Sequence, residues 1–214
     1  IDRGGRYAYG NQPAIAQWNL TRLAECLLPL LGDDPDAAAA DAIQALEAFA
    51  PAFERAYQDG LRRKLGLSTE REGDAALAED LLGAMAANRA DFTLTFRGLS
   101  EAAADETGDA EVRSLFADPA AYDAWALRWR QRLREEPGDA AARCKAMLAV
   151  HPAFIPRNHR VEAVIRAAVD RDDFAPFEEL LTVLARPYDS QPDFARYMGP
   201  PAAHERVLQT FCGT

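Results

Sequence analysis

One short segment of the chain brings three chemically versatile side chains together just before a predicted helix. In Ile155-Pro156-Arg157-Asn158-His159, a proline fixes the backbone and is followed by a guanidinium, an amide and an imidazole. The planar guanidinium of Arg157 donates several fixed hydrogen bonds, which suits both a binding cleft and a structural tie. The residues leave two interpretations open: segment 155–159 lines a functional cleft, or it is a loop held by its own hydrogen bonds.

The remaining polar residues do not form a recognisable catalytic or metal-binding pattern. The three histidines, His151, His159 and His204, have neither HxxxH nor HExxH spacing, and no CxxC pair accompanies them. Acidic residues fall mainly on helical faces, where they are typical of solvated surface. We therefore expect no catalytic, cofactor-binding or metal-binding residue within this chain.

The glycine-rich segment at residues 4–12 is not a phosphate-binding loop by its pattern. It matches neither GxGxxG nor GxxxxGK[ST], and no strand precedes it within the chain. We interpret it as a structural turn that leads into a helix beginning at Pro13.

Three cysteines are too few and too scattered for a disulfide framework, and their odd number fits a reducing compartment. Cys26 and Cys144 fall within amphipathic helices, where thiols usually behave as small buried hydrophobes. Cys212 lies beside Gly213 in an irregular terminal segment, where a thiol can be exposed and reactive. It is the candidate for redox chemistry.

Composition excludes several classes of partner. The 214 residues are 49% hydrophobic and 27% charged, as in a globular domain, and 34 acidic against 24 basic residues give a net charge of −10. Such acidity argues against nucleic acid, whose binding draws on clustered Lys and Arg. No apolar run approaches the roughly 20 residues of a membrane-spanning helix, and no signal peptide is expected.

Apolar residues recur at helical spacing almost throughout, and no convincing strand pair is present, so the predicted fold is mainly α. Gly66 should end one long helix, and Pro51 should kink or divide it. Helix starts or N-caps are expected at Pro13, Asp34-Pro35, Asp74, Asp91, Pro119, Asn158, and Asp172 or Asp173. Residues 101–108 are expected to form a loop or a frayed helix end.

An aromatic stripe should form the core of one helix, since Tyr122, Trp125, Trp129 and Leu133 follow helical spacing. The segment 122–148, turned by Pro137-Gly138-Asp139, looks like one tetratricopeptide hairpin. A repeat scaffold needs about three such units and no second copy is present, so this remains an alternative.

Ordered motifs from one end of the chain to the other resemble the selenoprotein O family. The matching segments are Gly5-Arg6-Tyr7-Ala8-Tyr9-Gly10-Asn11-Gln12-Pro13, Trp18-Asn19-Leu20, Arg22-Leu23-Ala24, Lys64-Leu65-Gly66-Leu67, Asp91-Phe92-Thr93, Phe96-Arg97, Ile155-Pro156-Arg157-Asn158-His159, Pro187-Tyr188 and Phe211-Cys212-Gly213-Thr214.

This resemblance implies a protein-kinase-like fold that transfers AMP from ATP, with magnesium, to Ser, Thr or Tyr hydroxyls of proteins. The chain resembles only the C-terminal half: residues 1–12 correspond to the end of the activation-segment region, 13–186 to a helical lobe, and 187–214 to an irregular, proline-rich C-terminal tail. The groups that hold ATP and the metal are expected upstream, so this part alone should be inactive. The alternative is an autonomous helical protein-interaction module without catalysis.

The resemblance also implies residue roles and partners. The motif residues expected near the cleft are Arg6, Tyr7, Asn11, Gln12, Arg157, Asn158 and His159. Cys212 matches a position where the family has selenocysteine or cysteine, which agrees with a redox role. The expected partners are the N-terminal half of the same protein and protein substrates, in the bacterial cytoplasm or, for a eukaryotic protein, in mitochondria.

Overall fold

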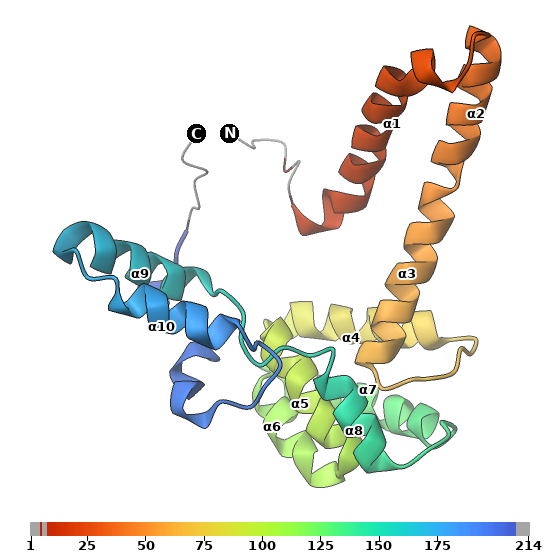
Figure 1. Ribbon diagram of the computed structural model, residues 1–214. Coiled ribbons are helices and arrows are strands. Elements are labelled where there is room, and N and C mark those ends of the chain that lie inside the picture. The colour runs from red at the N-terminus through yellow and green to blue at the C-terminus, as the bar shows by residue number, and fades with distance from the viewer. Residues whose placement is uncertain (1–4, 6–7, 209–214) are drawn as a thin grey trace. The chain divides into compact units, whose positions relative to one another are not determined.

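The computed structural model describes Gly5 and residues 8–208, which fold into helices without a strand (Figure 1). The chain divides into two compact units, Ile1–Gly60 and Leu61–Thr214. The predicted mainly α fold is therefore confirmed.

The first unit is a run of three helices. A short 3-10 turn, η1 (Tyr9–Asn11), leads into α1 (Gln12–Leu31), which packs against α2 (Pro35–Glu47). As expected from sequence, Pro13 lies in the first turn of α1, and the Asp34 carboxylate caps α2 by accepting hydrogen bonds from backbone N–H groups. Pro51 lies in the first turn of α3 (Phe49–Lys64), so the long apolar stripe is divided, as one of the two expected outcomes.

The second unit begins at Leu61, in the last turn of α3. Gly66 adopts φ +74°, and the N–H of Leu67 donates to the carbonyl of Arg62 at 2.9 Å, which is the hydrogen bond of a Schellman cap. A Cβ on residue 66 would lie 2.7 Å from Met147 Sδ, so both the backbone conformation and the packing require glycine here. The predicted helix end at Gly66 is confirmed.

Helix α5 (Phe92–Ala104) is the central element of this unit. It packs against α6 (Asp109–Ser114) and α8 (Ala140–Leu148), while α4 (Asp74–Asn88) packs on α7 (Pro119–Leu133). Because α8 packs principally on α5 rather than along α7, the two do not form a tetratricopeptide-like hairpin. The elements after α3 are α4 (Asp74–Asn88), α5 (Phe92–Ala104), η2 (Glu106–Gly108), α6 (Asp109–Ser114), α7 (Pro119–Leu133), α8 (Ala140–Leu148), α9 (Asn158–Arg171), α10 (Ala175–Leu184), η3 (Pro192–Tyr197) and η4 (Ala203–Glu205).

The predicted aromatic stripe of α7 is buried and forms the main core. The two indole rings stack with their centroids 5.3 Å apart. Each indole N–H also donates to a backbone carbonyl: Trp125 to Leu77 at 2.8 Å, and Trp129 to Leu65 at 2.9 Å. The stripe therefore both excludes water and ties α7 to α4 and to the end of α3.

A smaller core joins α9, α10 and the following chain. Helices α9 and α10 lie side by side (Figure 1), and their buried cluster consists of Ala153, Phe154, Val164, Leu180, Val183 and Tyr197. Buried Gln191 donates through Nε2 to the carbonyls of Val183 at 3.0 Å and Arg186 at 2.9 Å. The segment after α10 is thus held by specific contacts, with two short 3-10 turns, η3 and η4.

Three of the helix boundaries predicted after α4 are wrong. Helix α5 continues through residues 101–104 because Ala102 and Ala103 are buried in the core, and η2 and α6 follow at once. The N-cap of α9 is Arg157, one residue before the predicted Asn158. Neither Asp172 nor Asp173 begins α10: the first is the left-handed C-cap of α9, and the α10 N-cap is Phe174.

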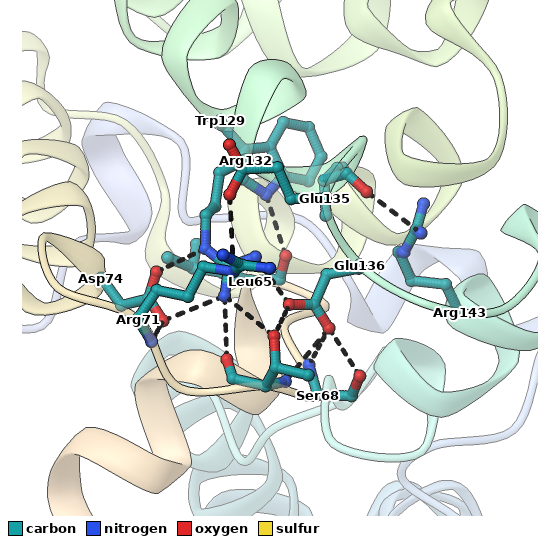
Figure 2. A network of polar contacts seen from close by, with 11 residues as sticks. Leu65, Ser68, Arg71, Asp74, Trp129, Arg132, Glu135, Glu136 and Arg143 are labelled. Atoms are coloured by element: carbon teal, nitrogen blue, oxygen red, sulfur yellow. Dashed lines mark hydrogen bonds and ion pairs between the residues drawn. The ribbon is translucent and has the colours of Figure 1, made fainter.

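A buried ion network fixes the loop between α3 and α4 (Figure 2). The Arg132 guanidinium donates to Asp74 Oδ1 at 2.7 Å, to Glu136 Oε1 at 2.6 Å and to the carbonyl of Thr69 at 2.8 Å. Glu136 Oε2 accepts from the backbone N–H groups of Ser68 at 2.6 Å and Thr69 at 3.1 Å. Asp74 is therefore not the N-cap of α4 that the sequence suggested: the cap is Gly73, and the Asp74 carboxylate binds Arg132 instead.

Removing the cation of this network should strongly destabilise the fold. Arg132→Met leaves two buried carboxylates without their partner, so we expect the free energy of unfolding to fall by about 3–5 kcal/mol in urea denaturation. Arg128→Ala is the matched control on the same helix, because its ion pair with Asp80 is exposed on both sides and should contribute less than about 1 kcal/mol. Equal losses in the two variants would contradict this account.

The same network should make stability depend on acidity. Burial raises the pKa of Glu136, but hydrogen bonds from Ser68, Thr69 and Arg132 outweigh it and lower the pKa from 4.5 to about 2. A depressed pKa stabilises the fold above pH 4.5, and this contribution, roughly 3 kcal/mol, is lost as pH falls toward 2. Urea denaturation between those values should show a shallower pH slope for Glu136→Gln than for Glu135→Gln, its exposed neighbour. An unchanged slope in Glu136→Gln would disprove the assignment.

Candidate functional site

Segment 155–159, for which the sequence left a cleft and a loop held by its own hydrogen bonds both open, lines a pocket of about 430 Å³ within the second unit. The loop before α9 forms one wall, and the chain around η4 forms the other. The lining residues are Ile155, Pro156, Arg157, Asn158, His159, Pro201, Arg206, Val207 and Leu208. Three of the motif residues, Arg157, Asn158 and His159, are thus brought together with tail residues that sequence reasoning did not single out.

Arg157 has a structural partner that the sequence did not reveal. Its guanidinium binds Asp91 with two hydrogen bonds, of 2.7 and 3.0 Å, and only 9% of the residue is exposed. Asp91 also caps α5 by accepting from the N–H of Leu94 at 2.9 Å, as the sequence predicted. Burial raises the pKa of Asp91, but the hydrogen bonds from Arg157 and the Leu94 N–H together outweigh it, so the net pKa is below the ordinary value. The carboxylate is therefore ionised at neutral pH. Arg157 therefore ties the start of α9 to the start of α5.

His159 is only 6% exposed, and neither of its ring nitrogens has a hydrogen-bond partner among the described residues. Burial lowers its pKa, and so does the charge of Arg160, while Glu205 acts in the opposite direction. The imidazole is therefore neutral at pH 7, with one N–H donor and one acceptor unused.

A second buried cluster fixes the loop that leads to this pocket. Arg97 Nη1 donates to the carbonyls of His151 at 2.8 Å, Tyr188 at 3.1 Å and Leu148 at 3.3 Å. The His151 ring lies 2.8 Å from Ser100 Oγ, and burial together with the charges of Lys64 and Arg97 lowers its pKa to about 3. This Ser–His pair is fully buried, so it supports the loop and is not accessible as a nucleophile.

These residues do not fit a magnesium nucleotide. Within the described part of the chain, no group of three His, Cys, Asp or Glu side chains could hold a metal ion. The ammonium of Lys64 donates to the carbonyl of Val150 at 3.2 Å and lies over the ring of Phe96. The buried carboxylates of Asp74 and Glu136 are held by Arg132.

The described motif residues at the start of the chain, Gly5 and 8–12, are joined by hydrogen bonds of the kind expected in a turn that leads into α1. Asn11 Nδ2 donates to the carbonyl of Gly5 at 2.8 Å, as does the N–H of Ala8 at 3.0 Å. Gln12 is the first residue of α1. Arg6 and Tyr7 lie outside the described residues.

The cysteines differ from expectation in one respect. Cys26 is exposed, because no residue of α1 is buried, so the predicted buried thiol at this position is wrong. Cys144 is half-buried, and burial raises the pKa of its thiol. Cys212, the redox candidate, lies outside the described residues.

None of the described helices combines the length and the apolar character that crossing a bilayer requires.

The fold and the pocket define a mainly helical protein with a pocket between the start of α9 and the chain around η4. Residues 1–185 match the family model described as protein adenylyltransferase SelO. The chain therefore belongs to the SelO family.

Bacterial relatives match over the entire chain. The protein nucleotidyltransferase YdiU of Rhodopseudomonas palustris (strain BisB18) is 66% identical over 214 residues, which are all of this chain and 43% of that protein. The protein of the same name from Methylorubrum extorquens is 64% identical over 220 residues, again all of this chain and 44% of that protein. The chain thus spans less than half the length of these curated relatives.

The Arg157–Asp91 pair should be energetically coupled. Arg157→Gln leaves a largely buried carboxylate without its cation, so the free energy of unfolding should fall by roughly 2–4 kcal/mol. Asp91→Asn keeps an N-cap residue on α5, and the double variant should lose about 1–3 kcal/mol less than the two single losses added together.

The measurement is a double-mutant cycle by urea denaturation. Arg166→Gln on α9 is the control, because its pair with Glu162 is exposed and should contribute at most about 0.5 kcal/mol. Additive losses at residues 91 and 157 would show that the two side chains do not stabilise each other.

Proposed function

We propose that this chain is the helical C-terminal part of a protein adenylyltransferase that transfers AMP from ATP to Ser, Thr or Tyr hydroxyls of proteins. The observation that carries the proposal is the family match over residues 1–185, together with relatives that cover the whole chain. ATP and magnesium are bound by the remainder of the longer protein. This part provides the helical lobe and a surface for protein substrates.

An apolar groove in the first unit supports the proposal that this chain is part of a longer protein. It is lined by Leu20, Leu23, Ala24, Leu27, Leu31, Asp41, Ala42, Ala45, Leu46 and Phe49. Helix α1 buries none of its 20 residues, although Leu23, Leu30 and Trp18 are large and apolar. Soluble proteins rarely leave such patches uncovered. We propose that residues of the longer protein outside this chain cover the groove.

The C-terminal segment is proposed to carry redox control through Cys212. The support is its position in the terminal Phe-Cys-Gly-Thr motif, which resembles that of the selenoprotein O family. The relatives reported above are bacterial, which favours a bacterial cytoplasm over mitochondria as the setting.

The activity is tested by incubating protein substrates with ATP labelled in the α-phosphate and magnesium. The longer gene product should label proteins with AMP, whereas the 214-residue chain alone should not, because its described residues include no cluster of side chains that could hold the metal ion. Labelling by the chain alone would show that the nucleotide site is misplaced. Failure of the longer product would favour the alternative, a helical interaction module.

The redox assignment is tested in the same assay with the longer gene product. Cys212→Ser should abolish the response of the labelling rate to oxidant and reductant, whereas Cys26→Ser should retain it. A response unchanged in Cys212→Ser would remove the redox role.

A further inference from the structure

The pocket beside α9 offers hydrogen-bond donors that no described residue uses. The N–H groups of Asn158 and His159 precede the first intrahelical hydrogen bonds of α9, which are those of Arg160 and Val161 to the carbonyl of Arg157. The side chain of the N-cap, Arg157, does not cap the helix and is directed to Asp91 instead. A 14-residue helix therefore presents an uncapped, partially positive end to the pocket.

A second and independent observation at the same place is the unpartnered imidazole of His159. The residue lines the pocket and is only 6% exposed, yet both ring nitrogens lack a partner among the described residues. The Nε of Arg157, which also lines the pocket, is likewise buried and finds no partner in the part of the chain that the structure describes. Buried polar atoms of this kind are normally satisfied, so each one calls for a group that binds it.

The charges around the pocket determine the sign of that group. Arg206 is exposed, lines the pocket and has no ion pair among the described residues. Arg160 also acts on His159 with a positive charge. Two acids lie nearby: Asp91, which is paired with Arg157, and Glu205, which accepts from the N–H of Ala202 at 2.9 Å and whose charge also acts on His159. Against these two carboxylates stand three guanidinium groups, those of Arg157, Arg160 and Arg206. In a chain with a net charge of −10, this pocket is locally cationic.

We propose that this pocket binds the phosphate group of a small molecule. A helix N-terminus supplies N–H donors to such an anion, and guanidinium and imidazole groups supply charge-assisted hydrogen bonds. The volume of about 430 Å³ leaves room for more than an isolated phosphate, so a larger phosphorylated compound fits the same chemistry. His159 is the residue that recognises the bound oxygen atoms, and Arg206 supplies the free positive charge. This inference does not rest on the proposed function.

The test is a titration followed by NMR of the histidine ring nitrogens, at constant ionic strength maintained with chloride. The probes are inorganic phosphate, pyrophosphate and AMP. We expect a saturable shift of the His159 resonance, assigned with His159→Gln, at a dissociation constant below about 10 mM for at least one probe. His151, which is enclosed beside Ser100, serves as the internal reference and should not shift.

The variants distinguish specific binding from general attraction. Arg206→Ala changes an exposed residue and should weaken binding at least about fivefold, whereas Arg171→Ala, at the C-terminal end of the same helix, should leave it unchanged. Tightest binding of AMP would identify a nucleotide as the source of the phosphate, and equal binding of all three probes would identify the phosphate group alone. A response without saturation for every probe, or equal effects of the two arginine variants, would overturn the proposal.

Discussion

The ion network around the buried guanidinium of Arg132 is the interaction on which the arrangement of α4, α7 and the end of α3 depends. Two carboxylates, Asp74 and Glu136, are buried against it, and neither would be stable there without the cation. Because Glu136 also holds the N–H groups of Ser68 and Thr69, the network places the loop between α3 and α4 on α7. The indole of Trp129 reinforces this placement from the apolar side through the carbonyl of Leu65.

A chain of hydrogen bonds connects the loop between α3 and α4 to the pocket beside α9. Lys64, one residue before the loop, donates to the carbonyl of Val150, where the chain leaves α8. From there the backbone runs without regular structure to residue 157, so its polar groups need other partners. Arg97 supplies hydrogen bonds at His151, and Arg157 anchors the far end at Asp91. Both anchors are on or next to α5, so the pocket wall before α9 is positioned by α5.

The sequence was most informative where periodic burial decides structure. The stripe of α7 and the caps Asp34 and Asp91 were predicted correctly, because apolar spacing and short-range hydrogen bonds are local properties. Asp74 looked the same as Asp91 in sequence, but its partner, Arg132, is 58 residues away and no local pattern reveals it. The same limit applies to the pocket: the segment before α9 was recognised, whereas its contacts with Asp91 and with residues near Arg206 arise only from the fold.

The choice of arginine for these contacts has a physical reason. Of the 24 basic residues, only Lys64 and Lys145 are lysine. The buried hydrogen bonds that join distant segments are made by arginines such as Arg132 and Arg157, which donate to several acceptors at once. The planar guanidinium group can donate to two or three acceptors in fixed directions, whereas the ammonium group of lysine, on a flexible side chain, does not. Lys64 illustrates the contrast, since it reaches one carbonyl and burial lowers its pKa. Arginines whose donors are held by carboxylates or backbone carbonyls thus position the helices. Arg206 has no ion pair within the described part of the chain, and we propose that it binds a group from outside the chain.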